Sequence, residues 1–430
     1  MAGLAGSFEE RTMKKVMYRL IPFLWILYII AYIDRVNISY AALEMNADLA
    51  ITAEMYGILS GTFFIAYFLF EVPSNLLMQR YGARIWLARI MITWGLVVVI
   101  TGFAQSVWQL YILRFLLGAA EAGFFPGVMY YLTYWFRNQE LGRAYSWFLI
   151  SLPAATLIGA PVSTWIIDHI HWFNLAGWRW MFILEGLLAV VFGLICLAYL
   201  KNRPQDARWL TDEEKNWLEG ELEKERQEKY ALKGTSRWQA LKNSNTWKIS
   251  VFYFIVFASM YGLGFWLPTI VQGFSDDLSN TTIGLISMLP SILVIPFIIL
   301  WGQHSDKTGE RKYHIIISIW LAACGFLGAG LSTSPVLAMI FITLASMGLY
   351  GIGGPLWSFL HSFYNQSASA VGIALVNSLA SLGGFFGPMV FGFFDYKSGM
   401  FFLCFMLIVS TLPVFTIKEN AKEKPENVHI

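Results

Sequence analysis

The stretch GQHSDKTGER, residues 302–311, joins two long apolar runs, and its basic residues and a glycine recur earlier in the chain. The earlier copy is NLLMQRYGAR, residues 75–84, which also joins two apolar runs. At one offset of 227 residues the matching pairs are Arg80 with Lys307, Gly82 with Gly309, Arg84 with Arg311, Pro161 with Pro388, and Asp168 with Asp395. A fixed offset indicates an internal repeat, so we expect two related halves.

Apolar residues dominate the rest of the chain. Its 430 residues are 57% hydrophobic and only 13% charged, whereas a soluble protein carries about 25% charged residues. Apolar runs of about 20 residues recur, and each is long enough to cross a bilayer as a helix. We therefore expect an all-α polytopic membrane protein with six spans in each half. The predicted spans are 17–42, 55–79, 83–104, 107–132, 141–168, 178–200, 246–273, 281–302, 313–331, 335–361, 367–394 and 398–417.

One long polar segment separates the sixth and seventh spans, and it divides the chain into three parts. We expect an N-terminal six-helix bundle over 1–200, a linker over 201–245, and a C-terminal bundle with a short tail over 246–430. Thr211 and Glu214 have the spacing of a capping box, which predicts that a surface helix begins there.

Lys and Arg gather at alternate ends of the predicted spans, and this bias sets the orientation of a membrane protein. They precede the first span, follow the second, fourth, eighth and twelfth, and are frequent in the linker. The opposite loops hold few, with Arg179 and Lys397 as the main exceptions. We therefore expect both termini and the linker in the cytoplasm, and the protein in the inner membrane.

The quoted stretch resembles the G-x-x-x-D-R-x-G-R-R/K cytoplasmic loop of the major facilitator superfamily. Its glycine permits a tight turn, and its basic residues can hold helix C-termini and lipid phosphates. The earlier copy departs from the pattern, with Gln79 where the family has Asp and Asn75 where it has Gly. We assign a gating and orienting role to these two loops, through Arg80, Gly82, Arg84, Asp306, Lys307, Gly309 and Arg311.

Further segments narrow the resemblance to the anion:cation symporter family. They are YIDRVNIS, FEVPSNLL, RFLLGAAEAGFFPG, GWRWMFILEG, RPQDARWLTDEE and GLGFWLP, and they extend over nearly the whole chain. The family includes carriers of galactonate, glucarate, tartrate, phthalate and 4-hydroxyphenylacetate. The resemblance therefore implies uptake of an organic anion, usually driven by protons.

Charges in the middles of the predicted spans are confined to the N-terminal half. They are Asp34, Arg35, Glu71, Arg114, Glu121 and Glu185. A charge at a helix centre costs about 2.5–3.5 kcal/mol on insertion scales, so such residues pair inside the protein or serve a pathway. Because the scaffold repeats and these charges do not, we expect one asymmetric site. A buried structural ion pair is the alternative, and we favour a structural role for Glu71 and Glu185.

Helix geometry divides the roles among these charges. Asp34 and Arg35 are adjacent and point about 100° apart, so they cannot face the same spot. Tyr32 shares the face of Arg35, and Arg114 shares the face of Glu121 two turns away. We therefore expect Tyr32 and Arg35 to face a central cavity, and Asp34 to point toward Arg114.

A guanidinium group binds a carboxylate through two parallel hydrogen bonds, so Arg35 suits an anionic substrate. Asp34 and Glu121 suit proton carriage, with Arg114 as a partner. Burial raises the pKa of a carboxyl group and a nearby positive charge lowers it, so the pKa can move across neutral pH. The resemblance implies the same roles for the matching Asp, Glu and Arg. It also implies that Tyr67, Trp357 and Asn377, which match ligand-binding positions of the family, contact the substrate. We add Tyr261 as a further candidate contact, because it lies at the repeat position of Asp34.

Together these features predict a secondary transporter that moves an organic carboxylate, such as a sugar or hydroxy acid, together with a proton. We expect no covalent catalysis, no metal or organic cofactor, and a monomer in the bilayer; the net charge of +2 does not suggest nucleic acid. The open alternatives are an aromatic-acid carrier, a sodium- or potential-driven carrier, an efflux antiporter and a non-transporting sensor.

Overall fold

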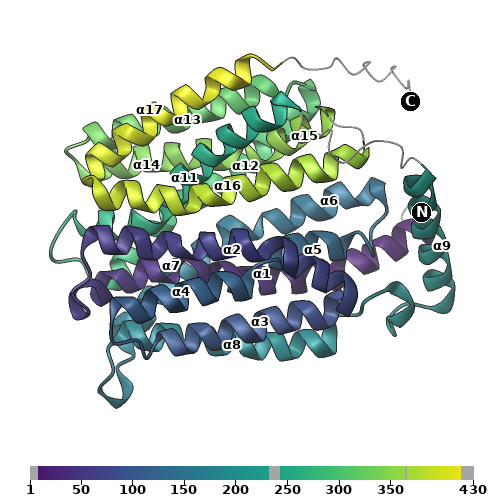
Figure 1. Cartoon of the computed structure of the whole chain (residues 1–430), viewed down its shortest axis with the longest axis horizontal. Helices are drawn as coiled ribbons and strands as arrows, with labels where there is room; N and C mark the ends of the chain where they lie inside the picture. Colours follow the sequence, from purple (N-terminus) through teal and green to yellow (C-terminus); the bar gives the residue numbers. More distant parts are fainter. Residues whose placement is uncertain (1–7, 232–242, 364–365, 418–430) are drawn as a thin grey trace, which may run out of the picture. The chain divides into compact units, whose positions relative to one another are not determined.

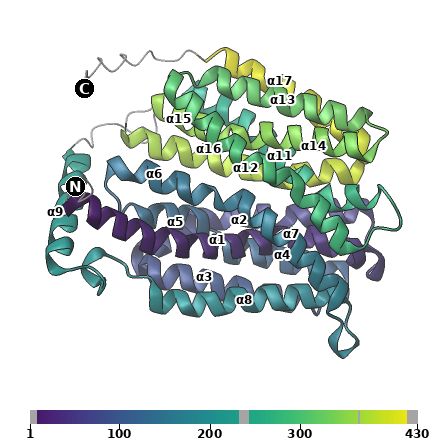
Figure 2. The same cartoon turned by 180° about the vertical axis from the view of Figure 1, so that it is seen from behind.

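The computed structural model describes residues 8–231, 243–363 and 366–417, and every regular element in these ranges is helical. Figures 1 and 2 show the helices from two opposite sides. Within these ranges twelve helical segments are long and apolar enough to cross a membrane. The prediction of an all-α protein with twelve spans is confirmed.

The helices fall into two series along the chain. The first series is α1 (Phe8–Asp48), α2 (Ala53–Tyr81), α3 (Ala83–Thr101), α4 (Val107–Glu121), α5 (Phe124–Leu132), α6 (Asn138–Leu149), α7 (Ser151–His169), α8 (Gly177–Tyr199) and α9 (Asp212–Ala231). The second series is α11 (Ser244–Gln272), α12 (Asn280–Thr308), α13 (Lys312–Leu331), α14 (Pro335–Gly351), α15 (Gly353–Phe363), α16 (Gln366–Phe393) and α17 (Tyr396–Phe415). Two 3-10 turns, Trp172–Asn174 and Pro204–Asp206, lie on either side of α8.

Three predicted spans are broken into two helices each. The span predicted over 107–132 ends one helix at Glu121 and begins the next at Phe124, across Gly123 in the left-handed region with φ 87°. In each of the three breaks the new helix has proline as its third residue, at Pro126, Pro153 or Pro355. Proline suits a first helical turn, where its missing N–H leaves no helix hydrogen bond unmade. Other prolines, such as Pro73 in α2, lie inside continuous helices, so proline alone does not set these breaks.

The helices divide into two compact units, each described here by itself. Unit 1 comprises Met1–Ala231 with Leu263–Ser291. In it, α3 and α8 lie side by side (Figure 1), and they approach closely at Gly95 and Gly186. A Cβ atom on either glycine would lie 2.7 Å from the carbonyl oxygen of the other. Small residues allow such close backbone contact between membrane helices.

Unit 1 includes the C-terminal part of α11 and the first turns of α12. The Tyr56 hydroxyl donates a hydrogen bond of 2.8 Å to the carbonyl oxygen of Phe265. The backbone N–H and the hydroxyl of Thr281 both donate to Asp168 Oδ2, each at 2.6 Å. These polar contacts attach α11 and α12 to α2 and α7.

The helix expected near Thr211 is confirmed as α9, which crosses the end of unit 1 where α1 begins (Figures 1 and 2). The Glu214 N–H donates to Thr211 Oγ1, and the Thr211 N–H donates to Glu214 Oε2, which completes the capping box. Lys15 of α1 forms an ion pair of 2.9 Å with Glu214. This pair ties the linker helix to α1.

Unit 2 comprises Leu232–Gly262 with Ile292–Ile430. Its described part has α13 packed between α14 and α17. The two copies of the repeat share backbone features: Gly82 and Gly309 both have positive φ, at 84° and 70°. Pro161 lies inside α7, and its match Pro388 lies inside α16. The repeat seen in the sequence therefore corresponds to a repeat in local structure.

Candidate functional site

Five charged residues gather around the middle of α1 in unit 1, and we call them the charge cluster. Its members are Asp34, Arg35, Arg114, Glu121 and Glu185, and all five are buried. They come from α1, α4 and α8, helices far apart in the sequence.

The centre of the charge cluster is an ion pair between Arg35 and Glu121. Arg35 Nε donates to Glu121 Oε1 at 3.1 Å, and Nη2 donates to the same oxygen. The side chains are 7% and 0% exposed. The other carboxylate oxygen, Oε2, is buried and has no hydrogen-bond partner among the described residues. Arg35 thus uses two donors on one oxygen, rather than the two-oxygen fork that a carboxylate can accept.

Aromatic rings surround the Arg35 guanidinium group. Its central carbon lies 5.3 Å from the ring centre of Phe63, 5.4 Å from Tyr67 and 5.9 Å from Tyr32. These separations are within the range of cation–π attraction. The structure therefore brings Tyr32, Arg35 and Tyr67 together, as the sequence predicted, and adds Phe63.

Asp34, which we expected to point toward Arg114, forms its hydrogen bond with another residue. Asp34 Oδ2 instead accepts a hydrogen bond of 2.9 Å from Trp94 Nε1 of α3. Arg114 donates to the Arg35 carbonyl oxygen at 3.1 Å and reaches Asn37 Oδ1 at 3.5 Å. The face of α1 that carries Asp34 packs on α3, which places the indole N–H of Trp94 within hydrogen-bond distance of this carboxyl group.

Glu185 is held by neutral groups, as expected for a structural carboxyl group. Ser163 Oγ donates to Oε1 at 2.6 Å, and Asn37 Nδ2 donates to Oε2 at 3.1 Å. Asn37 therefore connects Glu185 to Arg114. Sequence reasoning missed Trp94, Asn37 and Ser163. The indole of Trp94 and the amide of Asn37, each inside an apolar span, could have marked them as partners for a buried charge.

In unit 2, two of the predicted ligand residues belong to one row of aromatic rings. Trp357 of α15 lies 5.8 Å from Tyr253 of α11, measured between ring centres. Tyr253 lies 4.7 Å from Phe257, which lies 5.5 Å from Tyr261. Asn377 lies on α16, half-buried, and its backbone carbonyl accepts from Ser381 Oγ. The ligand roles of Trp357, Tyr261 and Asn377 stay predictions.

The two repeated loops hold helix ends in different ways. In the first loop, Arg84 Nε donates at 2.6 Å to the Leu197 carbonyl oxygen near the end of α8. In the second loop, Arg311 pairs with Asp306 at 2.6 Å and donates to Ser305 Oγ. The first loop has Gln79 at the position of Asp306 in the second loop. Because Gln79 offers no carboxylate, Arg84 donates to a carbonyl group instead.

Comparison with known proteins places the chain among transporters. Residues 24–388 match the family model of the Major Facilitator Superfamily. A protein of Agrobacterium vitis named "Putative tartrate transporter" is 40% identical over 97% of each chain. The "Quinolone resistance transporter" of Acinetobacter baumannii is 35% identical over 99% of each chain. The xylose transporter XylE of E. coli, in a partially occluded inward-open conformation, superposes with a TM-score of 0.74 at 16% identity, over 95% of this chain and 100% of that one.

Proposed function

Because the chain belongs to the Major Facilitator Superfamily and is a membrane transporter rather than an enzyme, we propose that it takes up an organic carboxylate together with protons. The substrate class is a hydroxy or sugar acid, of which tartrate is one example. The relative named for tartrate supports this class. Transport proceeds by alternating access, in which two halves rock around a central site.

The observation that carries the proposal is the state of Arg35. Its guanidinium group is buried, ringed by aromatic side chains, and paired with a single oxygen of Glu121. A substrate carboxylate can offer both oxygens to the same guanidinium, which is the stronger arrangement. Protonation of Glu121 removes its charge and releases Arg35 to the substrate. By linkage, the substrate then raises the affinity of the protein for the proton by the same factor.

The charge balance supports proton coupling as well. Two guanidinium groups of the charge cluster stand among three carboxyl groups, so a substrate anion adds a further negative charge to a buried region. An uncompensated buried charge is costly. Entry of an anion therefore favours uptake of a proton, with Glu121 as the first carrier and Asp34 as the second.

The remaining assignments complete this transporter. Tyr32, Tyr67, Trp357, Tyr261 and Asn377 contact the hydroxylated carbon chain of the substrate, while Arg114 orders the backbone at Arg35. The protein acts as a monomer in the inner membrane, with six-helix halves over 1–200 and 246–430. The distribution of Lys and Arg supports cytoplasmic termini and a cytoplasmic linker.

Efflux is the second candidate function, favoured by the relative named for quinolone resistance. The direction of coupling separates the two. In liposomes with an alkaline interior, protons flow inward. An uptake symporter then carries its substrate inward with the protons, whereas an antiporter expels its substrate in exchange for them.

The deciding experiment uses purified protein in liposomes with an alkaline interior. Radiolabelled tartrate, galactonate, glucarate, phthalate and 4-hydroxyphenylacetate are supplied outside, one at a time, and in a separate preparation a fluoroquinolone is loaded inside. We expect accumulation of at least one hydroxy acid, abolished by a protonophore and unchanged when sodium is replaced by choline. Accumulation that follows a sodium gradient, or proton-driven expulsion of the fluoroquinolone without acid uptake, would overturn the proposal.

A further inference from the structure

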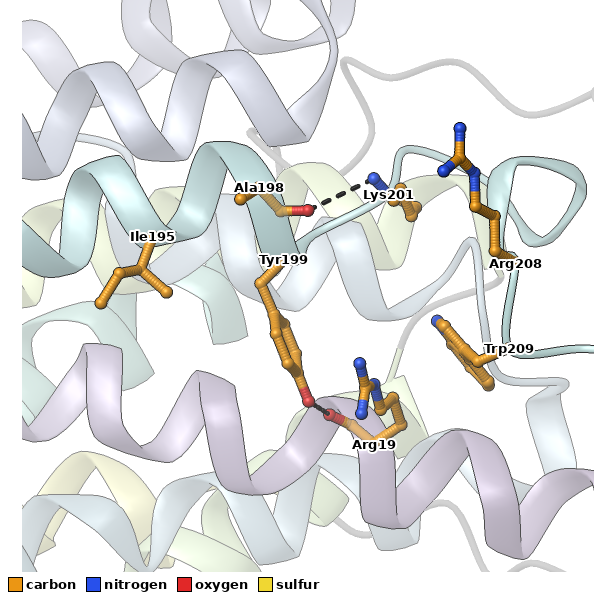
Figure 3. Close-up of a pocket in the computed structure, with 7 residues that line it drawn as sticks. All are labelled: Arg19, Ile195, Ala198, Tyr199, Lys201, Arg208 and Trp209. Atoms are coloured by element: carbon orange, nitrogen blue, oxygen red, sulfur yellow. Dashed lines mark hydrogen bonds between the residues drawn. The ribbon is translucent and has the colours of Figure 1, made fainter.

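A pocket of about 410 Å³ lies at the end of unit 1, away from the charge cluster. It forms where α8 gives way to the polar connection that leads to α9 (Figure 3). Its walls include Arg19 of α1, Ile195 and Tyr199 of α8, and Lys201, Arg208 and Trp209 of the connection. The transport function proposed above makes no use of it.

The pocket carries three positive charges and no carboxylate in its lining. Among the described residues, Arg19, Lys201 and Arg208 form no ion pair with an acidic side chain. Other cations at the same end are neutralised, for example Lys15 by Glu214 and Arg137 by Glu140. Three unneutralised cations around one hollow indicate a site for an anion.

The aromatic floor of the pocket is already ordered. The Tyr199 hydroxyl donates to the Arg19 carbonyl oxygen at 2.9 Å, and its ring stacks on Phe23 with centres 4.2 Å apart. The Arg19 guanidinium lies 4.6 Å from the Tyr199 ring. Trp209 stacks on Trp135 at 5.7 Å. A ligand would therefore meet a preformed surface, which lowers the entropic cost of binding.

One wall of the pocket is apolar and continues along a membrane-spanning helix. Ile195 is exposed, and Val191 and Leu188, which share its face of α8, are exposed too. This helix is among the most apolar spans of the chain. The stripe gives acyl chains a path that ends at the three cations. Tyr and Trp at such a boundary are typical of the headgroup level of a bilayer.

We propose that this pocket binds the headgroup of an anionic phospholipid, with the phosphodiester group held by Arg19, Lys201 and Arg208 and an acyl chain laid along Ile195, Val191 and Leu188. A soluble phosphate would use the cations but not the apolar wall, so the continuous stripe favours a lipid. The bound lipid would fasten α1, α8 and the linker connection together at one end of unit 1.

Native mass spectrometry of the full chain tests this proposal, with phosphatidylglycerol and phosphatidylcholine supplied in equal amounts. The wild type should retain phosphatidylglycerol in preference. Each basic residue near a membrane surface is worth about 1 kcal/mol, or about fivefold in affinity. We therefore expect Arg208→Gln alone to lower the preference about fivefold, and the Arg19→Gln, Lys201→Gln, Arg208→Gln combination to lower it more than tenfold.

The matched control removes three exposed cations from the same part of the chain but outside the pocket, by Arg11→Gln, Lys14→Gln and Arg143→Gln. It should keep the wild-type preference; an equal loss would show general surface attraction and overturn the site. Absence of any preference in the wild type would also overturn it. Displacement of the lipid by millimolar inorganic phosphate would assign the pocket to a soluble anion instead. If the triple pocket variant fails to fold, the single Arg208→Gln variant decides, because Arg208 is exposed.

Discussion

Replacing Glu121 by glutamine separates proton coupling from substrate transport. The change keeps an oxygen that can accept from Arg35 Nε and Nη2, but it removes the negative charge and the ability to release a proton. The side chains are 7% and 0% exposed, so solvent cannot compensate for the lost charge. Removing one partner of a buried ion pair costs about 3–5 kcal/mol, and the retained hydrogen bonds place the expected cost at the lower end.

That cost applies to the empty protein and is relieved when an anion binds to Arg35. The Glu121→Gln protein should therefore bind the substrate anion as tightly at pH 8 as at pH 6, whereas the wild type should bind it more weakly at pH 8. Driven accumulation should disappear. A difference of one pH unit supplies about 1.36 kcal/mol, or about tenfold accumulation, through the Glu121 proton alone. Because the variant cannot release a proton at this position, its driven cycle is blocked and it should reach only equal concentrations on both sides.

The assay measures counterflow and pH-driven uptake on the same liposomes, with the acid that the wild type accumulates best. Counterflow should persist in Glu121→Gln while accumulation falls from about tenfold to none. The matched control is Glu185→Gln, a buried carboxyl group held by Ser163 and Asn37, which should retain both activities. Full pH-driven accumulation by Glu121→Gln would refute the reasoning and leave Glu121 as a structural partner of Arg35.

Three further predictions concern the substrate site, the orientation in the membrane and the linker helix. Arg35→Lys should weaken substrate binding by at least tenfold in a direct binding assay with normal folding, because lysine lacks the planar fork; unchanged affinity would remove Arg35 from the site. In a cysteine-free background, cysteine at Asp276 should react with an impermeant maleimide from outside the cell and cysteine at Gln227 should not; the reverse pattern would contradict the proposed orientation. Partial burial raises the pKa of Glu214, but the hydrogen bond and charge of Lys15 together with the hydrogen bonds of Thr211 outweigh it, and the net pKa is lowered. A lowered pKa means that this contact stabilises α9 above about pH 4.5 and is lost as the pH falls below that value, so hydrogen exchange in α9 should rise there in the wild type but not in Glu214→Gln.

Local patterns account for what could be predicted. A span is recognised from the hydropathy of about 20 consecutive residues, so all twelve were found, and the capping box at Thr211 was found from two residues three apart. The helix breaks before Pro126, Pro153 and Pro355 were not predicted, because other prolines of the chain, such as Pro73, lie inside unbroken helices. The confinement of the charges to one half could also be recognised from the sequence, by comparing the two halves of the repeat.

The sequence by itself thus determined the fold class, the repeat, and which residues carry buried charge. Only the tertiary structure decided the hydrogen-bond partners: Glu121 for Arg35, Trp94 for Asp34, and Ser163 for Glu185. The physical reason is that hydropathy and capping act within a few residues, whereas a partner depends on which helix packs against each face of α1. Two adjacent side chains point about 100° apart, so they meet different neighbouring helices, and the packing of α1 decides which.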